Sequence, residues 1–338
     1  MNLIAEFNLE TKVKFSSHTI YRNNQLIHSP TTSSLKSLLS RKNLKENWYL
    51  FNGFLHEEST EEKTVHDLIK EKKLSPETVW YFLVPLASLY MSMSYLKTSQ
   101  LPLSIIIYWW KKYCCPFYVN YMYSYIKGGN QKLIESLISH NKKTQFFTKQ
   151  KVEQVKRSEK SVSIHVNGST LEFDKVIMAT DPRSTLTRLS SPLSHEQEIL
   201  GNIDIGHVKS IVHQNSSYLH GKDITVKIQE SPKIETKMMA TWGANAYFDL
   251  RLNEEYYTTI MSPDLNPFSE KEILQENLFT VPLPTKKTFA AIKNIDSLNE
   301  NNLNSYFCGS YFNPFFYHED AISSVKKMTD KIKKDEKI

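Results

Sequence analysis

Short runs of alternating apolar and polar residues recur along the chain, and this alternation is typical of β-strands with one buried face. Residues 12–27 alternate on both sides of Asn23-Asn24, so we expect a hairpin that turns at these asparagines. A second hairpin is predicted at Asn167-Gly168, because Asn-Gly between alternating runs favours a two-residue turn. The same pattern predicts strands at residues 145–147, 152–155, 162–166, 170–173, 208–212, 225–228, 238–242 and 256–261.

A different spacing governs residues 35–101, where apolar side chains return every three or four positions, as on one face of a helix. We expect a helical block there, in which Ser75-Pro76 begins one helix, since a serine cap followed by proline is a start signal. Residues 3–9 and 320–334 are helical by the same pattern. This order of elements offers no cut between two autonomous halves, so the chain is expected to be a mixed α/β and α+β protein with interleaved domains.

The chain has 338 residues, of which 40% are hydrophobic and 23% are charged, and this is the composition of a folded globular protein. Much of its net charge of +6 lies in the lysines of residues 326–338. Acidic residues interrupt these lysines and no stacking aromatics accompany them. We therefore interpret the tail as the solvated face of a last helix and expect no nucleic-acid partner.

The cysteines Cys114, Cys115 and Cys308 offer neither a disulfide framework nor the paired CxxC elements of a zinc site. We expect no metal site and a reducing, cytoplasmic location. Residues 1–12 lack the apolar core of a secretory signal. The most apolar stretch, residues 101–126, is divided by two lysines and falls short of the roughly 20 apolar residues that span a bilayer, so no transmembrane segment is expected.

Three stretches of the chain resemble one enzyme superfamily. Residues 125–137, YIKGGNQKLIESL, look like the Gly-Gly turn and helix of flavin amine oxidases and phytoene-desaturase-like enzymes. Residues 151–155 and 171–182 are similar to that superfamily's x-V-x-x-V strand and its F-D-x-V-V-x-A-T-x-P strand. The closing segment, FCGSY followed by HEDAISS within residues 307–324, resembles a bacterial subgroup of amine-oxidase-like proteins predicted to bind NAD or FAD.

The resemblance implies a fold in which an incomplete, Rossmann-like FAD-binding domain is interleaved with a substrate domain of a mixed sheet and a helical block. The substrate domain would take residues 1–124 and 191–295. The FAD domain would take residues 125–190 and 296–338. The strand that ends at Ala179 is expected to be a central buried strand close to the strand of residues 306–309.

The resemblance also implies which residues bind FAD. Val152 would hold the adenine edge through its backbone, although a plain core valine is the favoured alternative. Ala179 and Thr180 end a strand beside the cofactor, where small residues permit a ligand to approach. Gly309 would let the backbone come close to the ribityl-phosphate part of the flavin.

The start of the last helix carries the remaining candidates. Glu319 and Asp320 would lie where the helix N–H groups face the cofactor, and the alternative is that Asp320 merely caps the helix. His318 is either a structural histidine or an acid or base near the flavin. Cys308, at the end of an apolar strand, is expected to be buried and without chemistry. No catalytic residue is assigned.

One departure from the superfamily affects the cofactor. The sequence contains no G-x-G-x-x-G turn, whose backbone N–H groups and helix end hold the pyrophosphate. Weak or absent FAD binding by this chain is therefore expected. A polypeptide that carries such a segment is an expected partner.

The sequence is compatible with two functions. One is an FAD-dependent oxidoreductase that transfers a hydride from a small hydrophobic substrate to the flavin, in a truncated or split form. The other is a non-catalytic remnant or binding subunit of the same fold, with contact to a membrane surface as a further alternative. The aromatic residues that would line a substrate cavity, meet lipid or pack in a core are Tyr108, Trp109, Trp110, Tyr121, Tyr123 and Tyr125.

Overall fold

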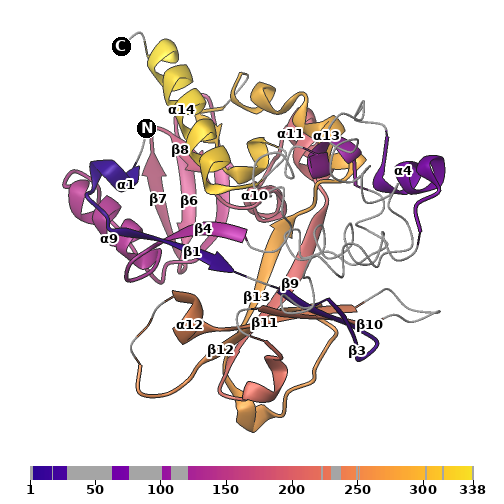
Figure 1. Cartoon of the computed structure of the whole chain (residues 1–338). Coiled ribbons are helices and arrows are strands. Elements are labelled where there is room, and N and C mark those ends of the chain that lie inside the picture. The colour runs from indigo at the N-terminus through magenta and orange to yellow at the C-terminus, as the bar shows by residue number, and fades with distance from the viewer. Residues whose placement is uncertain are drawn as a thin grey trace. The chain divides into compact units, whose positions relative to one another are not determined.

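The chain forms two compact units, each built from two separated segments (Figure 1). Unit 1 contains Met1–Gln145 and His207–Phe279, and unit 2 contains Phe146–Gly206 and Thr280–Ile338. The units thus alternate along the chain, with boundaries after residues 145, 206 and 279. Their assignment to a substrate domain and a cofactor domain stays a prediction. The computed structural model describes residues 3–16, 18–28, 63–75, 101–107, 121–221, 224–229, 237–248, 250, 252–300, 303–313 and 316–336.

The largest sheet has seven strands in the order β13-β9-β12-β11-β10-β2-β3 among the described residues. The pairs β9-β12, β12-β11, β11-β10 and β2-β3 are antiparallel, whereas β10 and β2 run parallel. Strands β9 and β13 pass from one unit into the other. The strands are β2 (His18–Arg22), β3 (Gln25–His28), β9 (Ile205–His213), β10 (Ile224–Gln229), β11 (Lys237–Gly243), β12 (Tyr257–Met261) and β13 (Ile273–Pro282).

The hairpin predicted at Asn23-Asn24 is confirmed between β2 and β3. Both asparagines have positive φ angles, 48° and 64°, which asparagine tolerates better than most residues and which a tight hairpin turn requires. The preceding residues do not belong to this hairpin. They form β1 (Thr11–Ser16), which pairs antiparallel with β4 (Tyr121–Ile126), so the interpretation of residues 12–27 as one hairpin is wrong for its first half. Alternation predicts a strand but not its partner.

Unit 1 also contains two helices that the spacing predicts and one, after the Gly-Gly turn, that the resemblance implies. Helix α1 (Leu3–Glu6) is short, and α9 (Gln131–His140) follows two glycines with φ angles of 87° and 83°. Helix α4 (Val65–Lys72) begins at Thr64, whose hydroxyl accepts a hydrogen bond from the Asp67 N–H while the Asp67 carboxylate accepts from the Thr64 N–H. Most of the helical block predicted at residues 35–101, including the helix from Pro76 onward, lies outside the described residues. The remaining short elements of unit 1 are α12 (Ala244–Phe248) and the 3₁₀ turns Ser216–Tyr218 and Glu270–Glu272.

A histidine lies inside the large sheet of unit 1. His213 is fully buried, and its Nε2 atom is 2.8 Å from Thr259 Oγ1, which is 2.8 Å from Thr241 Oγ1. The rings of Phe268 and Tyr257 pack against the imidazole, with centroids at 4.6 and 5.7 Å. Burial lowers the pKa of His213, and the Glu272 carboxylate opposes this effect only in part. The folded state therefore favours the neutral imidazole.

This burial predicts a pH dependence of stability. In the unfolded chain the pKa of a histidine is about 6.5, so below that pH the unfolded state binds more protons than the folded state and stability falls. We expect His213→Gln to reduce the slope of the unfolding free energy between about pH 6.5 and 5 by up to about 1.4 kcal/mol per pH unit. Urea titrations at several pH values would measure this slope. His207→Gln, at an exposed position of the same strand, should leave it unchanged.

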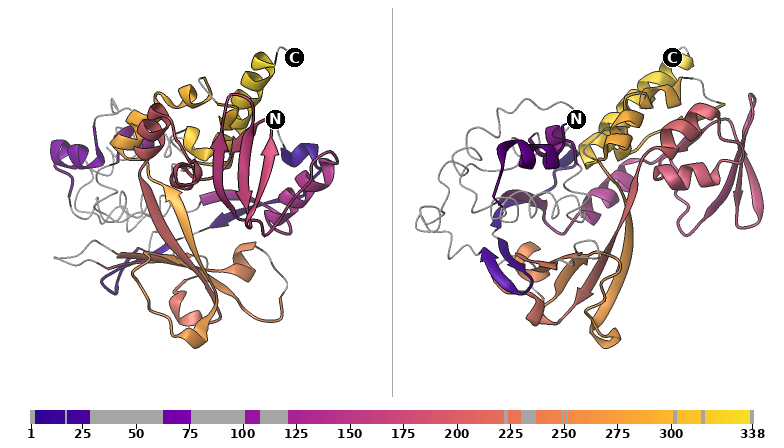
Figure 2. Two further views of the ribbon diagram at one scale, coloured as in Figure 1. Left: turned by 180° about the vertical axis from the view of Figure 1, so that it is seen from behind. Right: turned by 90° about the vertical axis from the view of Figure 1, so that its right-hand side faces the viewer.

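Unit 2 has a layered core. Strand β8 (Val176–Met178) pairs in parallel with β14 (Ser305–Phe307). Successive side chains from β14 onward point to opposite faces of the sheet and enter two different hydrophobic clusters. Tyr306 and Cys308 pack with Met328 of the long helix α14 (His318–Asp335), whereas Phe307 packs in the main cluster of the unit. Figure 2 gives two further views of α14 and the strands of this unit. No helix in the described part of the chain is long and apolar enough to cross a membrane.

A three-stranded antiparallel sheet, β5-β6-β7, completes the strands of unit 2 and confirms the hairpin at Asn167-Gly168. The helices of the unit lie between and after these strands, and the last helix predicted at residues 320–334 is confirmed as α14. The elements are β5 (Val152–Arg157), β6 (Val162–Val166), β7 (Ser169–Phe173), α10 (Pro182–Arg188), α11 (Ser194–Gly201), α13 (Lys286–Ile292) and the 3₁₀ turns Ile295–Asn299 and Ser310–Phe312.

Other sequence-based expectations are wrong. Residues 145–147 form no strand. Strand β8 is not buried throughout, since 49% of Ile177 is exposed and the described residues provide a ladder partner, β14, on one edge only. An apolar run shows that a segment can be buried, but neighbouring strands decide whether it is. The periodicity missed β13, α10, α11 and α13.

A buried ion pair joins three elements of unit 2. The two Nη atoms of Arg157 on β5 lie 2.6 and 2.7 Å from the two carboxylate oxygens of Glu196 on α11. Arg157 also donates to Ser305 Oγ on β14 at 2.8 Å, and Glu196 accepts from the Leu193 N–H at 2.8 Å. The exposed fractions of the two side chains are 2% and 0%. Each charge is therefore satisfied by its partner and by further hydrogen bonds.

Candidate functional site

The carboxyl ends of β8 and β14 lie side by side in unit 2. Phe307 is in register with Met178, and the Cys308 N–H donates to the Met178 carbonyl oxygen at 3.2 Å. The predicted proximity of the strand leading to Ala179 and the strand leading to Gly309 is thus confirmed. Ligands of open α/β sheets bind beyond the carboxyl ends of parallel strands, so a ligand site is expected at this edge.

Gly309 follows β14 in a conformation that other residues avoid, with φ 155° and ψ 171°. A Cβ atom on this residue would lie 2.6 Å from the ring of Tyr311. The Gly309 N–H donates to Ser324 Oγ on α14 at 3.0 Å. The backbone conformation and the contact with Tyr311 are enough to explain why this position is glycine. The role of Gly309 beside the flavin stays a prediction.

Replacing Gly309 by alanine is expected to lower the free energy of unfolding by about 2–4 kcal/mol, because the new methyl group adds both backbone strain and overlap with Tyr311. Gly168→Ala separates these two causes, since Gly168 has a φ of 74° but no atom within 4 Å of the added carbon. That control should cost only about 1 kcal/mol. Urea unfolding followed by circular dichroism would measure both. Equal losses in the two variants would contradict the overlap with Tyr311.

The start of α14 shows how Asp320 is used. One carboxylate oxygen of Asp320 accepts a hydrogen bond from the Tyr317 N–H at 2.8 Å, so the residue stabilises the first turn of the helix. Glu319 and His318 are exposed at the same end. The capping alternative for Asp320 is therefore supported by a direct contact, and the cofactor roles of Glu319 and Asp320 stay predictions.

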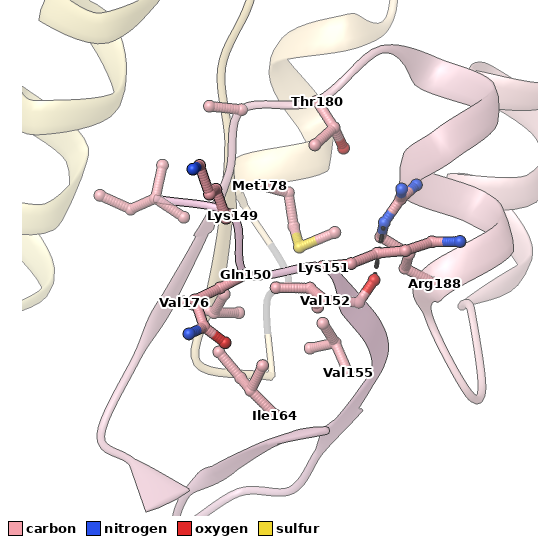
Figure 3. A pocket seen from close by; sticks show the side chains of 12 residues that line it. Lys149, Gln150, Lys151, Val152, Val155, Ile164, Val176, Met178, Thr180 and Arg188 are labelled. Carbon is pink, nitrogen blue, oxygen red and sulfur yellow. Dashed lines mark hydrogen bonds between the residues drawn. The ribbon is translucent and has the colours of Figure 1, made fainter. Parts of the chain in front are cut away.

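A cavity of about 670 Å³ opens beside the end of β8 (Figure 3). It lies within unit 2 and brings together the beginning of β5, the whole of β8 and the end of α10. Three of the predicted cofactor residues, Val152, Ala179 and Thr180, are among those that line it. Gly309, Glu319 and Asp320 belong to the same unit but not to the lining. The lining residues are Lys149, Gln150, Lys151, Val152, Val155, Ile164, Val176, Ile177, Met178, Ala179, Thr180 and Arg188.

The cavity has an apolar floor and a polar, cationic rim. Val155 and Met178 are buried, and the valine and isoleucine side chains beside them extend this surface. The polar contributions are an amide, a hydroxyl and three cationic side chains. Arg188 is held in place because its Nε and Nη1 atoms donate to the carbonyl oxygens of Val152, at 3.1 Å, and Ser184, at 2.9 Å. Such a site suits a ligand that has an apolar, flat part and an anionic part.

The sequence pattern missed several lining residues. Lys149 and Lys151 precede a strand, and such lysines ordinarily lie in solvent, so nothing in the local pattern singles them out. Arg188 lies on α10, a helix that the periodicity did not predict. Its start signal was nevertheless present, since Asp181 before Pro182 is a cap followed by proline, and the Asp181 carboxylate accepts from the Ser184 N–H at 2.9 Å.

In the described part of the chain, neither Cys308 nor the acidic residues suggest another kind of centre. Cys308 is buried as expected, and burial raises the pKa of its thiol, which keeps it in the unreactive protonated form. The described residues hold no group of three or more histidine, cysteine or acidic side chains that could bind a metal ion. The cavity of unit 2 is therefore the candidate site.

Comparison with known families identifies the relatives of this fold. The sequence model of flavin containing amine oxidoreductases matches residues 1–214. The chain belongs to this family. A comparison with curated proteins gives no match.

Several solved structures are similar to the chain over nearly its whole length. A putative protoporphyrinogen oxidase from Exiguobacterium sp. 255-15 is 13% identical, with a TM-score of 0.63, and the match covers 99% of this chain and 84% of that one. Cyclohexylamine oxidase from Brevibacterium oxydans IH-35A is 11% identical, with a TM-score of 0.60 and coverage of 99% and 85%. A fatty acid isomerase from P. acnes is 9% identical, with a TM-score of 0.58 and coverage of 97% and 82%. These similarities establish the fold.

The family binds FAD, and the cavity can be tested against that cofactor. The ADP half of FAD has a flat base and two negatively charged phosphates. The apolar floor suits the base, the cationic rim suits the phosphates, and no lining residue is an acid that would repel them. The residues present therefore fit this part of a flavin amine oxidoreductase's cofactor.

Proposed function

We propose that the chain is an FAD-dependent oxidoreductase whose unit 2 holds the cofactor beside the carboxyl ends of β8 and β14. The cavity there supports this proposal most directly, because Val152, Ala179 and Thr180 line it together. When bound, the flavin supplies a two-electron acceptor that takes a hydride from the substrate. The protein contributes binding and orientation.

The roles of individual residues follow from their positions. Val152 would form part of the wall against the adenine. Ala179 and Thr180, at the end of β8, leave room for a ligand to pass along the strand ends. Gly309 and the first turn of α14, including Glu319 and Asp320, would lie beside the more distant part of the cofactor. Ser324, in the second turn of α14, accepts a hydrogen bond from the Gly309 N–H and so ties the helix to the end of β14.

The proposed substrate is a small, largely apolar molecule. Two structurally similar proteins are named for such compounds, cyclohexylamine and a fatty acid. Substrate class is not fixed by the fold, so this part of the proposal depends on direct measurement.

Titration of the purified chain with FAD, followed by quenching of flavin fluorescence, tests the proposal. We expect saturable but weak binding and a colourless protein after purification, because the sequence has no G-x-G-x-x-G turn to hold the pyrophosphate. At saturating FAD, bleaching of the flavin by an oxidisable amine under anaerobic conditions would demonstrate the reaction. Absence of FAD binding at millimolar concentrations would overturn the proposal.

A second candidate is a non-catalytic binding subunit of the same fold. The missing G-x-G-x-x-G turn favours it, since a protein without a firmly held flavin lacks the group that carries the chemistry. The two candidates differ in one measurement. A binding subunit would not bleach FAD with any amine or acyl substrate, even when a complementing polypeptide is present.

A further inference from the structure

The cavity of unit 2 carries an unbalanced positive charge. Lys149, Lys151 and Arg188 line it, and none of its twelve lining residues is acidic. Figure 3 shows Lys149 on one side of the cavity and Lys151 and Arg188 on the other. Within the described residues, the hydrogen bonds of Arg188 go to backbone carbonyls, and no carboxylate pairs with either lysine. Three charges that repel one another are thus held around one opening without a counter-ion.

The backbone at Lys149 adds an independent observation. This residue has a φ of 60°, in the left-handed region that costs most side chains about 1–2 kcal/mol. Glycine would relieve this strain, and asparagine would reduce it. A lysine in this conformation is unfavourable for folding, which is the kind of local cost found at ligand-binding positions.

We infer that Lys149, Lys151 and Arg188 bind the diphosphate of an adenine nucleotide, which in the proposed function is the ADP half of FAD. Two observations favour a diphosphate over an acyl carboxylate. A diphosphate carries at least two negative charges, which match three cations, and the apolar floor formed by Val155 and Met178 accepts a flat base. The inference rests on the proposed function for the identity of the cofactor. It adds that side chains on this rim, and not only backbone N–H groups, hold the phosphates.

The contribution of each of these cationic side chains to ligand affinity can be measured. Lys149 and Lys151 are exposed, so each is expected to contribute about 2–5-fold to the affinity for a phosphate ligand. Arg188 is half-buried and held by Val152, and its contribution should be larger. All of these contributions should decrease as salt increases.

Calorimetric titration of the full chain with ADP and with adenosine tests the inference without any need for enzyme activity. We expect the wild-type chain to bind ADP at least about 10-fold more tightly than adenosine at low salt, and to lose most of this preference at high salt. The double variant K149G/K151Q should bind ADP about 4–25-fold more weakly and adenosine within about 2-fold of wild type. Lys156→Gln, at an exposed position of β5 outside the cavity, is the matched control and should behave as wild type.

Thermal unfolding of the variants shows whether they keep their structure. The substitution that weakens ADP binding is not expected to lower stability. K149G should unfold at the same temperature as wild type or higher, because glycine relieves the left-handed strain. The double variant K149G/K151Q should likewise unfold at no lower temperature than wild type, because Lys151 is exposed, and weaker ADP binding in it then does not come from loss of structure. Arg188→Lys, which keeps the charge but loses the fork that reaches Val152, should lower ADP affinity while retaining its salt dependence.

The possible failures are distinguishable. If FAD and adenosine bind but ADP is not preferred over adenosine, or if the preference survives in K149G/K151Q, the inference is wrong and the proposed function stands. If the wild-type chain binds none of FAD, ADP and adenosine, both the inference and the proposed function are overturned.

Discussion

Replacing Glu196 by glutamine is expected to lower the free energy of unfolding by about 3–5 kcal/mol, the largest effect of any single substitution considered for this protein. The carboxylate is fully buried, and both of its oxygens bind the guanidinium of Arg157. Without the negative charge, Arg157 would remain a cation inside unit 2 whose partners, the hydroxyl of Ser305, a backbone carbonyl and the amide oxygen of the new glutamine, are all neutral. Urea unfolding at pH 7 would measure the loss.

Two variants give this prediction its controls. Glu198→Gln, two residues away on the exposed side of α11, should change stability by less than about 0.5 kcal/mol. The double variant Arg157→Met with Glu196→Leu removes both charges and should recover much of the stability, because no unpaired charge remains. A loss below about 1 kcal/mol in Glu196→Gln would contradict the account of a buried ion pair whose two partners depend on each other.

Adding a polypeptide that contains a G-x-G-x-x-G turn with its flanking strand and helix is expected to tighten FAD binding by about 100-fold or more. The turn contributes several charge-assisted hydrogen bonds to the pyrophosphate, each worth roughly 1.5–3 kcal/mol, and two of them suffice for this change. The sequence of this chain contains no such turn. Flavin fluorescence and the visible spectrum, measured with and without the polypeptide, would follow the binding.

The same polypeptide with its three glycines replaced by alanine is the matched control. Its side chains would keep the backbone away from the phosphates, so it should not improve binding. Unchanged affinity with the intact polypeptide would favour the non-catalytic binding subunit over the split enzyme. Stoichiometric flavin bound to the isolated chain would contradict the expectation of weak binding.

Part of the candidate site could be predicted from sequence, because some of its residues lie in stretches that resemble the family and others do not. Val152 belongs to one family-like stretch, residues 151–155, and Ala179 and Thr180 belong to another, residues 171–182, so the resemblance was enough to place them in one site. Arg188 reaches the cavity from helix α10, whose weak periodicity concealed it. Its role depends on a hydrogen bond to Val152, 36 residues earlier. Such a contact leaves no mark on the local pattern.

The corrections to the fold have the same origin. Residues 12–16 alternate as a strand does, but their partner is β4, more than 100 residues later. In the same way, β2 pairs in parallel with β10 and not only with its hairpin neighbour β3. Hydrophobic periodicity predicts that a segment has a buried face, whereas loop closure and packing over the whole chain select which segment covers it.

The sequence by itself determined the elements whose cause is local. Asn23-Asn24 and Asn167-Gly168 set their hairpin turns through positive φ angles, and the spacing of apolar residues set α4 and α14. Only the tertiary structure decided that Arg157 and Glu196 meet in a buried pair and that three cationic side chains gather around the apolar floor of one cavity. Charges separated along the chain interact only where packing brings them together and excludes water, and that environment is a property of the folded chain.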